Sequence, residues 1–284
     1  MTTRNAVFLM AVVAILSGWT APPEKKDLID HLRAAYDFPS VADVDISEPA
    51  SCDVPGFRMA KLSLRYGTME HSESLYISED GRYYMLGKFK DVRVHPYEER
   101  LKKMELKDAG VRGKADAPVT VAQFTDFQCP YCQRGFEIMR DRVLKDFPDK
   151  VRWVYKSFPL AEIHPWAQPA AVAVECARKQ GNEKFWSLHD ALFDAQREIR
   201  ADKFEEKLQE LAKKAGIDDK KLMACYDKEE SLPTVRRDVK EAAEVGVNST
   251  PSFVVNGRIV AGADYNTLKR VIEDFLGKKV EEKR

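Results

Sequence analysis

Two cysteines separated by two residues, in the run Cys129-Pro-Tyr-Cys132, are the residues of this 284-residue sequence whose type and spacing most directly indicate chemistry. A thiolate attacks a disulfide, and a second thiol nearby resolves the mixed disulfide that forms. One helical turn brings two cysteines at this spacing within bonding distance. The pair therefore predicts thiol–disulfide exchange, in which Cys129 attacks and Cys132 resolves.

The neighbouring residues place Cys129 at the start of a helix. Residues 119–124, Val-Thr-Val-Ala-Gln-Phe, are mostly apolar and β-branched, as in a strand that is buried on both faces. A helix from Pro130 to about Leu144 is expected next, and proline suits its first position because the N–H that proline lacks would be unpaired there. Unpaired N–H groups and the helix dipole favour negative charge. They predict a pKa for Cys129 below the ordinary value of about 8.5.

Two other functions of a Cys-x-x-Cys pair remain open at this point. The pair could be half of a zinc site, but the chain has no second Cys-x-x-Cys and no histidine pair at ligand spacing. It could also be a structural disulfide, although such short loops are more often labile and catalytic. We therefore expect neither a metal nor a cofactor.

The sequence resembles the DsbA family of bacterial disulfide oxidoreductases, which have the thioredoxin fold, in two separated runs. The run from Gly113 to Cys132 is similar to the first strand and active site of that family. The run Thr250-Pro-Ser-Phe-Val-Val-Asn-Gly257 is similar to its cis-proline loop, although without the family Thr250-Pro251 would be interpreted as a strand entry. The resemblance covers roughly residues 108–277 and implies a cis Pro251 beside the sulfurs. It also implies which residues contact the substrate chain: Pro130, Tyr131, Thr250 and Pro251.

The chain departs from this family six residues before Cys129. Family members usually carry a buried carboxylate there, which helps to move the proton of the resolving thiol, whereas this sequence has Gln123. Glutamine does not exchange a proton at neutral pH. Asp126 and Lys156 are further candidates for redox tuning, with a solvated carboxylate and a surface lysine as their respective alternatives. His164 is expected to be a packed loop histidine or a residue at the rim of the active site.

The remaining cysteines are Cys52, Cys176 and Cys225. Some members of the DsbA family carry a second, structural disulfide in their helical domain, and the resemblance implies one between Cys176 and Cys225. Closing a loop of this length would stabilise the fold by about 4 kcal/mol in the chain-entropy model. Cys52 then remains as a free or intermolecular thiol, most simply a buried and inert one.

The N-terminus predicts export. Arg4 precedes an apolar run over residues 6–16, and small residues follow up to Ala21, as in a secretory signal peptide. The run is shorter than the roughly 20 apolar residues of a spanning helix. Trp19 and Pro22 weaken the cleavage site, so a retained membrane anchor and a buried N-terminal helix are the alternatives. Export predicts a periplasmic or other extracytoplasmic location, where disulfides persist.

Charge and repeats exclude other classes of protein. The 46 basic and 46 acidic residues are interspersed, and no basic groove is interleaved with aromatic residues, which argues against nucleic acid as a partner. No internal repeat is present at solenoid or propeller periods. The expected partners are unfolded or reduced secreted proteins and a membrane or soluble redox partner.

The hydrophobic pattern divides the chain into a signal peptide (1–21), a small α+β domain (22–100) and a DsbA-like domain (101–284). In the α+β domain, a helix over residues 24–37 precedes alternating strands. The run Glu79-Asp-Gly81 predicts a hairpin whose returning strand covers residues 83–94.

The pattern of the DsbA-like domain predicts an α/β core with an inserted helical domain at about residues 165–245, and the family resemblance implies that this core is a thioredoxin fold. A strand over residues 151–155 precedes the insertion, and strands over residues 252–255 and 258–260 follow it. Asn256-Gly257 joins the last two strands in a tight type I′ turn. A closing helix with Leu268, Val271, Ile272 and Phe275 on one face is expected to complete the domain.

Oxidases, isomerases and reductases share this exchange chemistry and differ in redox potential. We favour a thiol oxidase, because the helical insertion and its flanking motifs resemble the DsbA branch. Pro130-Tyr131 and Thr250 also resemble DsbG, and Thr250 resembles DsbC as well; both of these proteins dimerise through a small N-terminal domain. A disulfide isomerase or thiol reductase that forms a homodimer through its N-terminal domain is therefore the alternative. A chaperone or peptide-binding module is the non-enzymatic alternative.

Overall fold

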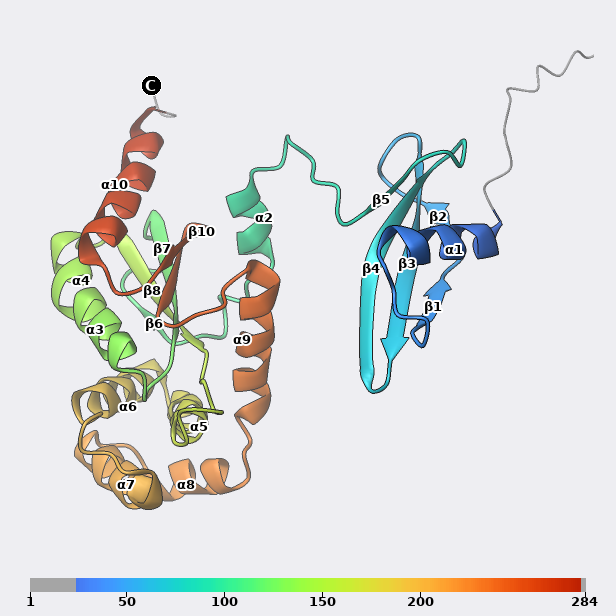
Figure 1. The fold of residues 1–284 in the computed structure, drawn as a ribbon. Helices are drawn as coiled ribbons and strands as arrows, with labels where there is room; N and C mark the ends of the chain where they lie inside the picture. The colour runs from blue at the N-terminus through green and yellow to red at the C-terminus, as the bar shows by residue number, and fades with distance from the viewer. Residues whose placement is uncertain (1–23, 282–284) are drawn as a thin grey trace, which may run out of the picture. The chain divides into compact units, whose positions relative to one another are not determined.

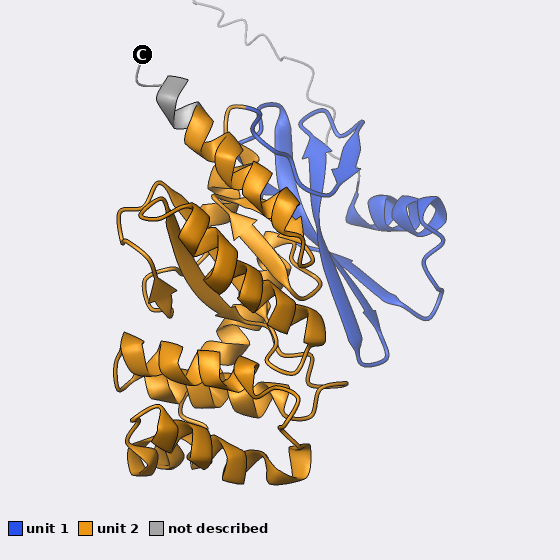
Figure 2. Cartoon of the chain, turned by 90° about the vertical axis from the view of Figure 1, so that its left-hand side faces the viewer, with its two compact units in different colours: residues 1–92 blue, residues 93–284 orange. Residues whose placement is uncertain are grey.

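The structure is a computed structural model that describes residues 24–281, so the expected signal segment lies outside the described residues. The chain divides near residue 92 into two compact units (Figure 2). Residues 93–100, which the sequence pattern assigned to the first domain, belong to the second unit. They include most of α2 (Pro96–Lys102), whose Arg100 donates hydrogen bonds to the carbonyl oxygens of Val245 and Gly257.

The first unit is an antiparallel sheet with one helix packed on it (Figure 1). Its helix is α1 (Lys25–Ala35), which buries Leu28 and Leu32 as the spacing predicts. These leucines share a core with Leu62 and Leu75 of the sheet. The strands are β1 (Asp43–Ile46), β2 (Ala50–Ser51), β3 (Phe57–Tyr66), β4 (Met69–Ser78) and β5 (Tyr84–Leu86). They follow the order β1-β3-β4-β5, and β2 pairs with β3.

The returning strand of the hairpin is shorter than the sequence pattern predicts. β5 pairs only with Leu75–Ile77 and ends at Leu86, well before residue 94. Gly87 then takes a positive φ of 128°. The chain turns, and the Phe89 ring packs against Phe57 and Tyr76. The prediction was wrong here because Phe89 makes ring contacts with these two residues instead of continuing the strand pairing, and it stays 40% exposed.

The second unit contains a mixed sheet in the order β10-β9-β7-β8-β6. β7 (Val119–Thr125) and β8 (Val151–Ser157) are parallel and central. β9 (Ser252–Val255) runs antiparallel to β7, and β10 (Arg258–Ala261) forms a hairpin with β9. β6 (Val111–Arg112) closes the other edge. Asn256 and Gly257 have φ values of 42° and 91°, in the sense that a type I′ turn requires.

Helices cover both faces of this sheet (Figure 1). Val121, Trp153 and Tyr155 share a core with α3 (Pro130–Ile138) and α10 (Tyr265–Glu281). Alternate residues of the same strands pack instead with α9 (Leu232–Val245). The helix that begins with α3 continues through a π-helical segment, Met139–Val143, into α4 (Leu144–Asp146).

The predicted helical insertion is present between β8 and β9. Besides α9, it contains α5 (Ala167–Arg178), α6 (Asn182–Asp194), the 3₁₀ turn η2 (Ala201–Lys203), α7 (Phe204–Lys214) and α8 (Asp219–Asp227). A disulfide joins Cys176 of α5 to Cys225 of α8, with 5.8 Å between the Cα atoms. The thioredoxin-like fold with a helical insertion, preceded by a small unit with its own sheet, is thus as the sequence predicts.

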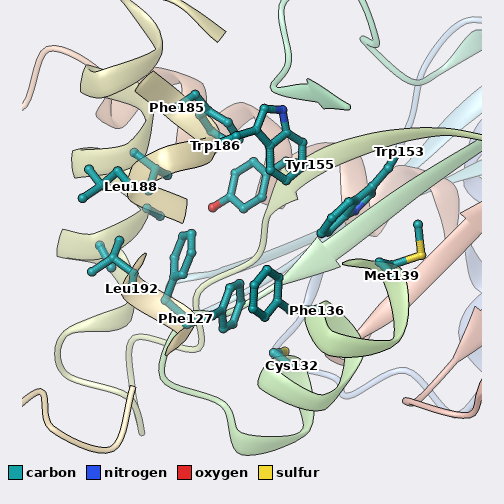
Figure 3. Packing of buried hydrophobic residues seen from close by; sticks show 14 of the residues in the cluster. Phe127, Cys132, Phe136, Met139, Trp153, Tyr155, Phe185, Trp186, Leu188 and Leu192 are labelled. Carbon is teal, nitrogen blue, oxygen red and sulfur yellow. The ribbon is translucent and has the colours of Figure 1, made fainter. Parts of the chain in front are cut away.

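A fully buried histidine, His189, lies where α6 meets the sheet. Figure 3 shows the aromatic side chains that gather in this region from β8, α3 and α6. The His189 ring contacts those of Phe127, Phe136, Trp153, Tyr155, Phe185, Trp186 and Phe193. Its Nδ1 lies 2.9 Å from Asp190 Oδ1, so it donates to that carboxylate. Burial lowers the pKa of His189 and keeps the ring neutral.

The lowered pKa of His189 predicts a loss of stability in mild acid. The unfolded chain binds a proton at this histidine near pH 6.5, whereas the folded chain does so only at lower pH. The free energy of unfolding therefore falls as the pH drops below about 6.5, by at most about 1.4 kcal/mol per pH unit. His189→Phe should reduce this slope in denaturant titrations, and His71→Gln, at an exposed histidine, should leave it unchanged. An equal slope in all three proteins would contradict the prediction.

Candidate active site

The two sulfurs lie at the beginning of α3, directly after the central strand β7. Cys129 is the residue before the first helical turn, and Pro130 is the first helical residue. The Cys132 N–H donates to the Cys129 carbonyl at 3.0 Å, which closes the turn. Both cysteines are free thiols; Cys132 is fully buried, and Cys129 keeps 7% of its surface exposed. Cys129 can therefore react with a thiol or disulfide of another molecule, whereas Cys132 can react only with a sulfur that is already bonded to Cys129.

The environment separates the acidities of the two thiols. A hydrogen bond from Cys132 lowers the pKa of Cys129 to about 6, against the opposing effect of burial, and the backbone N–H groups of Cys132 and Tyr131 add to the lowering. Burial raises the pKa of Cys132 well above its ordinary value, and the adjacent Cys129 raises it further. At neutral pH the reduced centre thus holds a thiolate at Cys129 and a neutral thiol at Cys132.

The Thr250-Pro251 loop packs against this turn. The peptide bond between the two residues is cis. The Thr250 side chain lowers the pKa of both sulfurs, so it lies at the pair. A Cβ atom at Gly135 of α3 would come within 3.3 Å of Pro251 Cβ and 3.2 Å of Phe253 Cζ, so glycine is what lets the helix approach the loop.

The residues expected to contact substrate thus lie around Cys129. Tyr131 is 68% exposed, and Pro130 is exposed next to it. With Thr250 and Pro251 they border the reactive sulfur. Their contacts with a substrate chain remain predictions.

Gln123 of β7 is buried beneath α3. Its amide nitrogen lies 3.2 Å from the position that a Gly135 Cβ would take. Neither the nitrogen nor the oxygen of this amide has a hydrogen-bond partner within the described part of the chain. The Thr125 hydroxyl on the same strand is also without such a partner, although its position lowers the pKa of Cys132. Thr125 thus lies at the resolving thiol and Gln123 lies beneath the same helix, and neither side chain can hold a proton at neutral pH.

Asp126 is buried, so the solvated alternative was wrong. The chain turns after β7 and brings backbone N–H groups around the carboxylate. Oδ1 accepts from the N–H of Gln128 at 2.7 Å and of Cys129 at 3.2 Å, and Oδ2 accepts from the N–H of Leu160 at 2.8 Å. The Asp126 N–H in turn points at Cys132 Sγ, 3.4 Å away. Asp126 therefore ties the active-site turn to both cysteines.

Lys156 is also fully buried, and the surface alternative was wrong. Its ammonium lies 3.1 Å from Asp238 and 2.9 Å from Glu241, both on α9, and donates to the Glu105 carbonyl at 2.6 Å. Its charge is thus compensated on the α9 side of the sheet. Redox tuning by Lys156 remains a prediction. The sequence pattern did not predict these two acidic partners, although both lie on the same face of α9 as the buried Val235 and Ala242.

Cys52 is half-buried in the first unit, rather than buried, and its thiol donates to the Phe57 carbonyl at 3.3 Å. Among residues 24–281, no group of three or more His, Cys, Asp or Glu side chains is arranged to hold a metal ion.

A thiolate at the start of a helix, a buried resolving thiol and a cis-proline loop on a thioredoxin-like sheet define a thiol–disulfide oxidoreductase. The family model described as thioredoxin, Thioredoxin_4, matches residues 106–274, which is more than half of the chain. The chain therefore belongs to this DsbA-like thioredoxin family, as the sequence resemblance implies.

A curated protein and a solved structure, both from Bacillus subtilis, are similar to this domain. Disulfide bond formation protein D of Bacillus subtilis is 33% identical over 175 residues, which cover 60% of this chain and 78% of that protein. The crystal structure of oxidised BdbD from Bacillus subtilis is 30% identical, with a TM-score of 0.56, and the match covers 61% of this chain and 95% of that one.

Longer proteins of another kind also contain a segment that is similar to part of this chain. Na(+)/H(+) antiporter NhaA 3 of Salinispora tropica is 38% identical over 149 residues, which are 52% of this chain but 22% of the antiporter. The chain thus spans about a fifth of the length of the first curated relatives that it matches. Within residues 24–281, no helix has the length and apolar character needed to cross a membrane.

The hydrogen bond from Cys132 predicts how the acidity of Cys129 responds to substitution. Cys132→Ala removes the donor, so the pKa of Cys129 should rise above about 6. Cys132→Ser keeps an O–H donor at the same place and should hold the pKa lower than the alanine variant does. Thiolate absorbance at 240 nm against pH measures both values. Equal pKa values in the two variants would show that the inner side chain does not stabilise the thiolate.

Proposed function

We propose that this protein is an exported thiol oxidase, which transfers its active-site disulfide to reduced secreted proteins. The low pKa of Cys129 is the observation that carries the proposal. A stabilised thiolate favours the reduced form of the protein over its disulfide, and this preference makes the disulfide form an oxidant. The name of the Bacillus subtilis relative, a disulfide bond formation protein, supports the same direction.

The reaction has two exchange steps. A substrate thiolate attacks Cys129 Sγ, the bond between the two active-site sulfurs breaks, and Cys132 leaves and takes up a proton. A second substrate thiolate then attacks the substrate sulfur of the mixed disulfide, and Cys129 leaves as a stable thiolate. The substrate gains a disulfide, and the protein receives its two electrons. A membrane or soluble redox partner must remove these electrons before another turnover.

The location is part of the proposal. The signal-like residues 1–21 and the disulfide between Cys176 and Cys225 both suit a periplasmic or other extracytoplasmic compartment. Unfolded or reduced secreted chains would be the substrates there.

The redox potential tests the proposed direction. After equilibration with glutathione at varied ratios, an oxidase should have a potential near about −120 mV, whereas a value near about −270 mV would indicate a reductant and contradict the proposal. The purified protein should also form disulfides in a reduced, unfolded secreted protein, and Cys129→Ser should abolish this activity. A biological activity that persists fully in Cys129→Ser would instead support the non-enzymatic alternative, a chaperone or peptide-binding module.

A dimeric isomerase or reductase is the second candidate, and the first unit favours it. β5 covers Leu75–Ile77 of β4 and the Gly87 N–H donates to the Ser74 carbonyl, so the outer edge of residues 69–73 has no strand partner among residues 24–281. An open strand edge can pair with the same edge of a second chain.

Sedimentation distinguishes the two candidates. A homodimer held by this edge should dissociate when residues 24–92 are removed, and its isomerisation of a scrambled disulfide substrate should fall with it. A full-length protein that sediments as a monomer over a wide concentration range would exclude the dimeric candidate.

A further inference from the structure

His164 is the side chain that completes the hydrogen bonds of the buried Asp126 carboxylate. It lies in the loop between β8 and α5, and its Nδ1 is 2.7 Å from Asp126 Oδ2. Its side chain is 18% exposed, and that of Asp126 is fully buried. The other three donors to this carboxylate are backbone N–H groups. His164 is therefore the side-chain donor that substitution can remove while the main chain keeps its donors.

Asp126 transmits this contact to the reacting sulfurs. Its Oδ1 accepts from the Cys129 N–H, and its own N–H points at Cys132 Sγ. The same loop is attached a second time, because the Trp166 N–H donates to Gln128 Oε1 at 2.9 Å. The 164–166 loop and the active-site turn are thus joined at two points, and one of them is the carboxylate of Asp126, the residue whose side chain contacts Cys129 and whose backbone N–H contacts Cys132.

The charge of Asp126 predicts which redox form the contact with His164 stabilises. A buried carboxylate beside the pair opposes the negative charge of the Cys129 thiolate, unless donors compensate it. A hydrogen bond to a charged group is among the stronger ones, and losing it leaves the carboxylate less compensated. The reduced form would then be less stable relative to the disulfide.

We propose that His164 is a positioning residue of the redox centre, which acts through Asp126 to orient the active-site turn and to stabilise the reduced form. The imidazole donates from Nδ1 to Asp126 Oδ2, which leaves Oδ1 aimed at the N–H groups of Gln128 and Cys129. The effect applies to exchange in either direction. It therefore does not depend on whether the protein is an oxidase.

Two isosteric variants separate a hydrogen bond at Nδ1 from mere packing. In His164→Asn the amide nitrogen takes a place similar to Nδ1, whereas in His164→Gln it lies nearer the place of Nε2. We expect His164→Ala to lower the equilibrium constant for reduction by glutathione about tenfold, which is about 30 mV toward a weaker oxidant. The pKa of Cys129, measured by thiolate absorbance, should rise in the same variant. His164→Asn should restore most of both values, and His164→Gln should not.

A double-mutant cycle tests the route through Asp126. In an Asp126→Asn background, His164→Ala should change the equilibrium constant by less than about twofold, because the charge that His164 compensates is gone. His71→Ala, at an exposed histidine of the first unit, is the matched control and should have no effect in either background.

The inference is overturned if His164→Ala leaves the equilibrium constant and the pKa of Cys129 unchanged, or if its effect is as large in the Asp126→Asn background. It is also overturned if the asparagine and glutamine variants behave alike. Should the alanine variant fail to fold, this last comparison still decides, with thermal unfolding confirming that both proteins are folded. None of these outcomes bears on the redox direction, so the oxidase proposal can fail while this one stands.

Discussion

The stabilised thiolate of Cys129 is the interaction on which the rest of the site depends. Burial opposes it, and the Cys132 hydrogen bond and two backbone N–H groups at the start of α3 overcome that opposition. The same burial keeps the proton on Cys132. One helix terminus thus produces a nucleophile and a resolving thiol from two identical side chains, because one of them lies outside the first turn and the other inside it.

The surrounding structure holds this terminus in place from two sides. On the strand side, the turn that follows β7 wraps its backbone N–H groups around Asp126. On the other side, the cis loop packs on α3 at Gly135, where a side chain would crowd Pro251. The opposite face of the sheet is closed by α9, whose acidic residues pair with buried Lys156. The sheet itself is therefore fixed on both faces before any substrate arrives.

Local sequence patterns predicted most of the fold because they reflect local physics. The β-branched run before Cys129 forms β7, and Pro130 begins α3, as the preferences of strands and of the first helical position require. Asn256-Gly257 forms the predicted turn for the same reason. The pattern failed where contacts within the first unit decided the outcome: residues 87–92 leave the sheet, and the Phe89 ring packs against Phe57 and Tyr76 while staying partly exposed.

The sequence by itself determined the chemistry, because two cysteines one helical turn apart after a strand require only local geometry to become a redox pair. Only the tertiary structure decided the environment of the charged residues near them. Asp126 and Lys156 look like surface residues in the sequence. They are buried because donors and partners from distant segments, Leu160 for the carboxylate and Glu241 for the ammonium, replace the water that each would otherwise require. No local pattern reports such partners, since the fold alone brings them together.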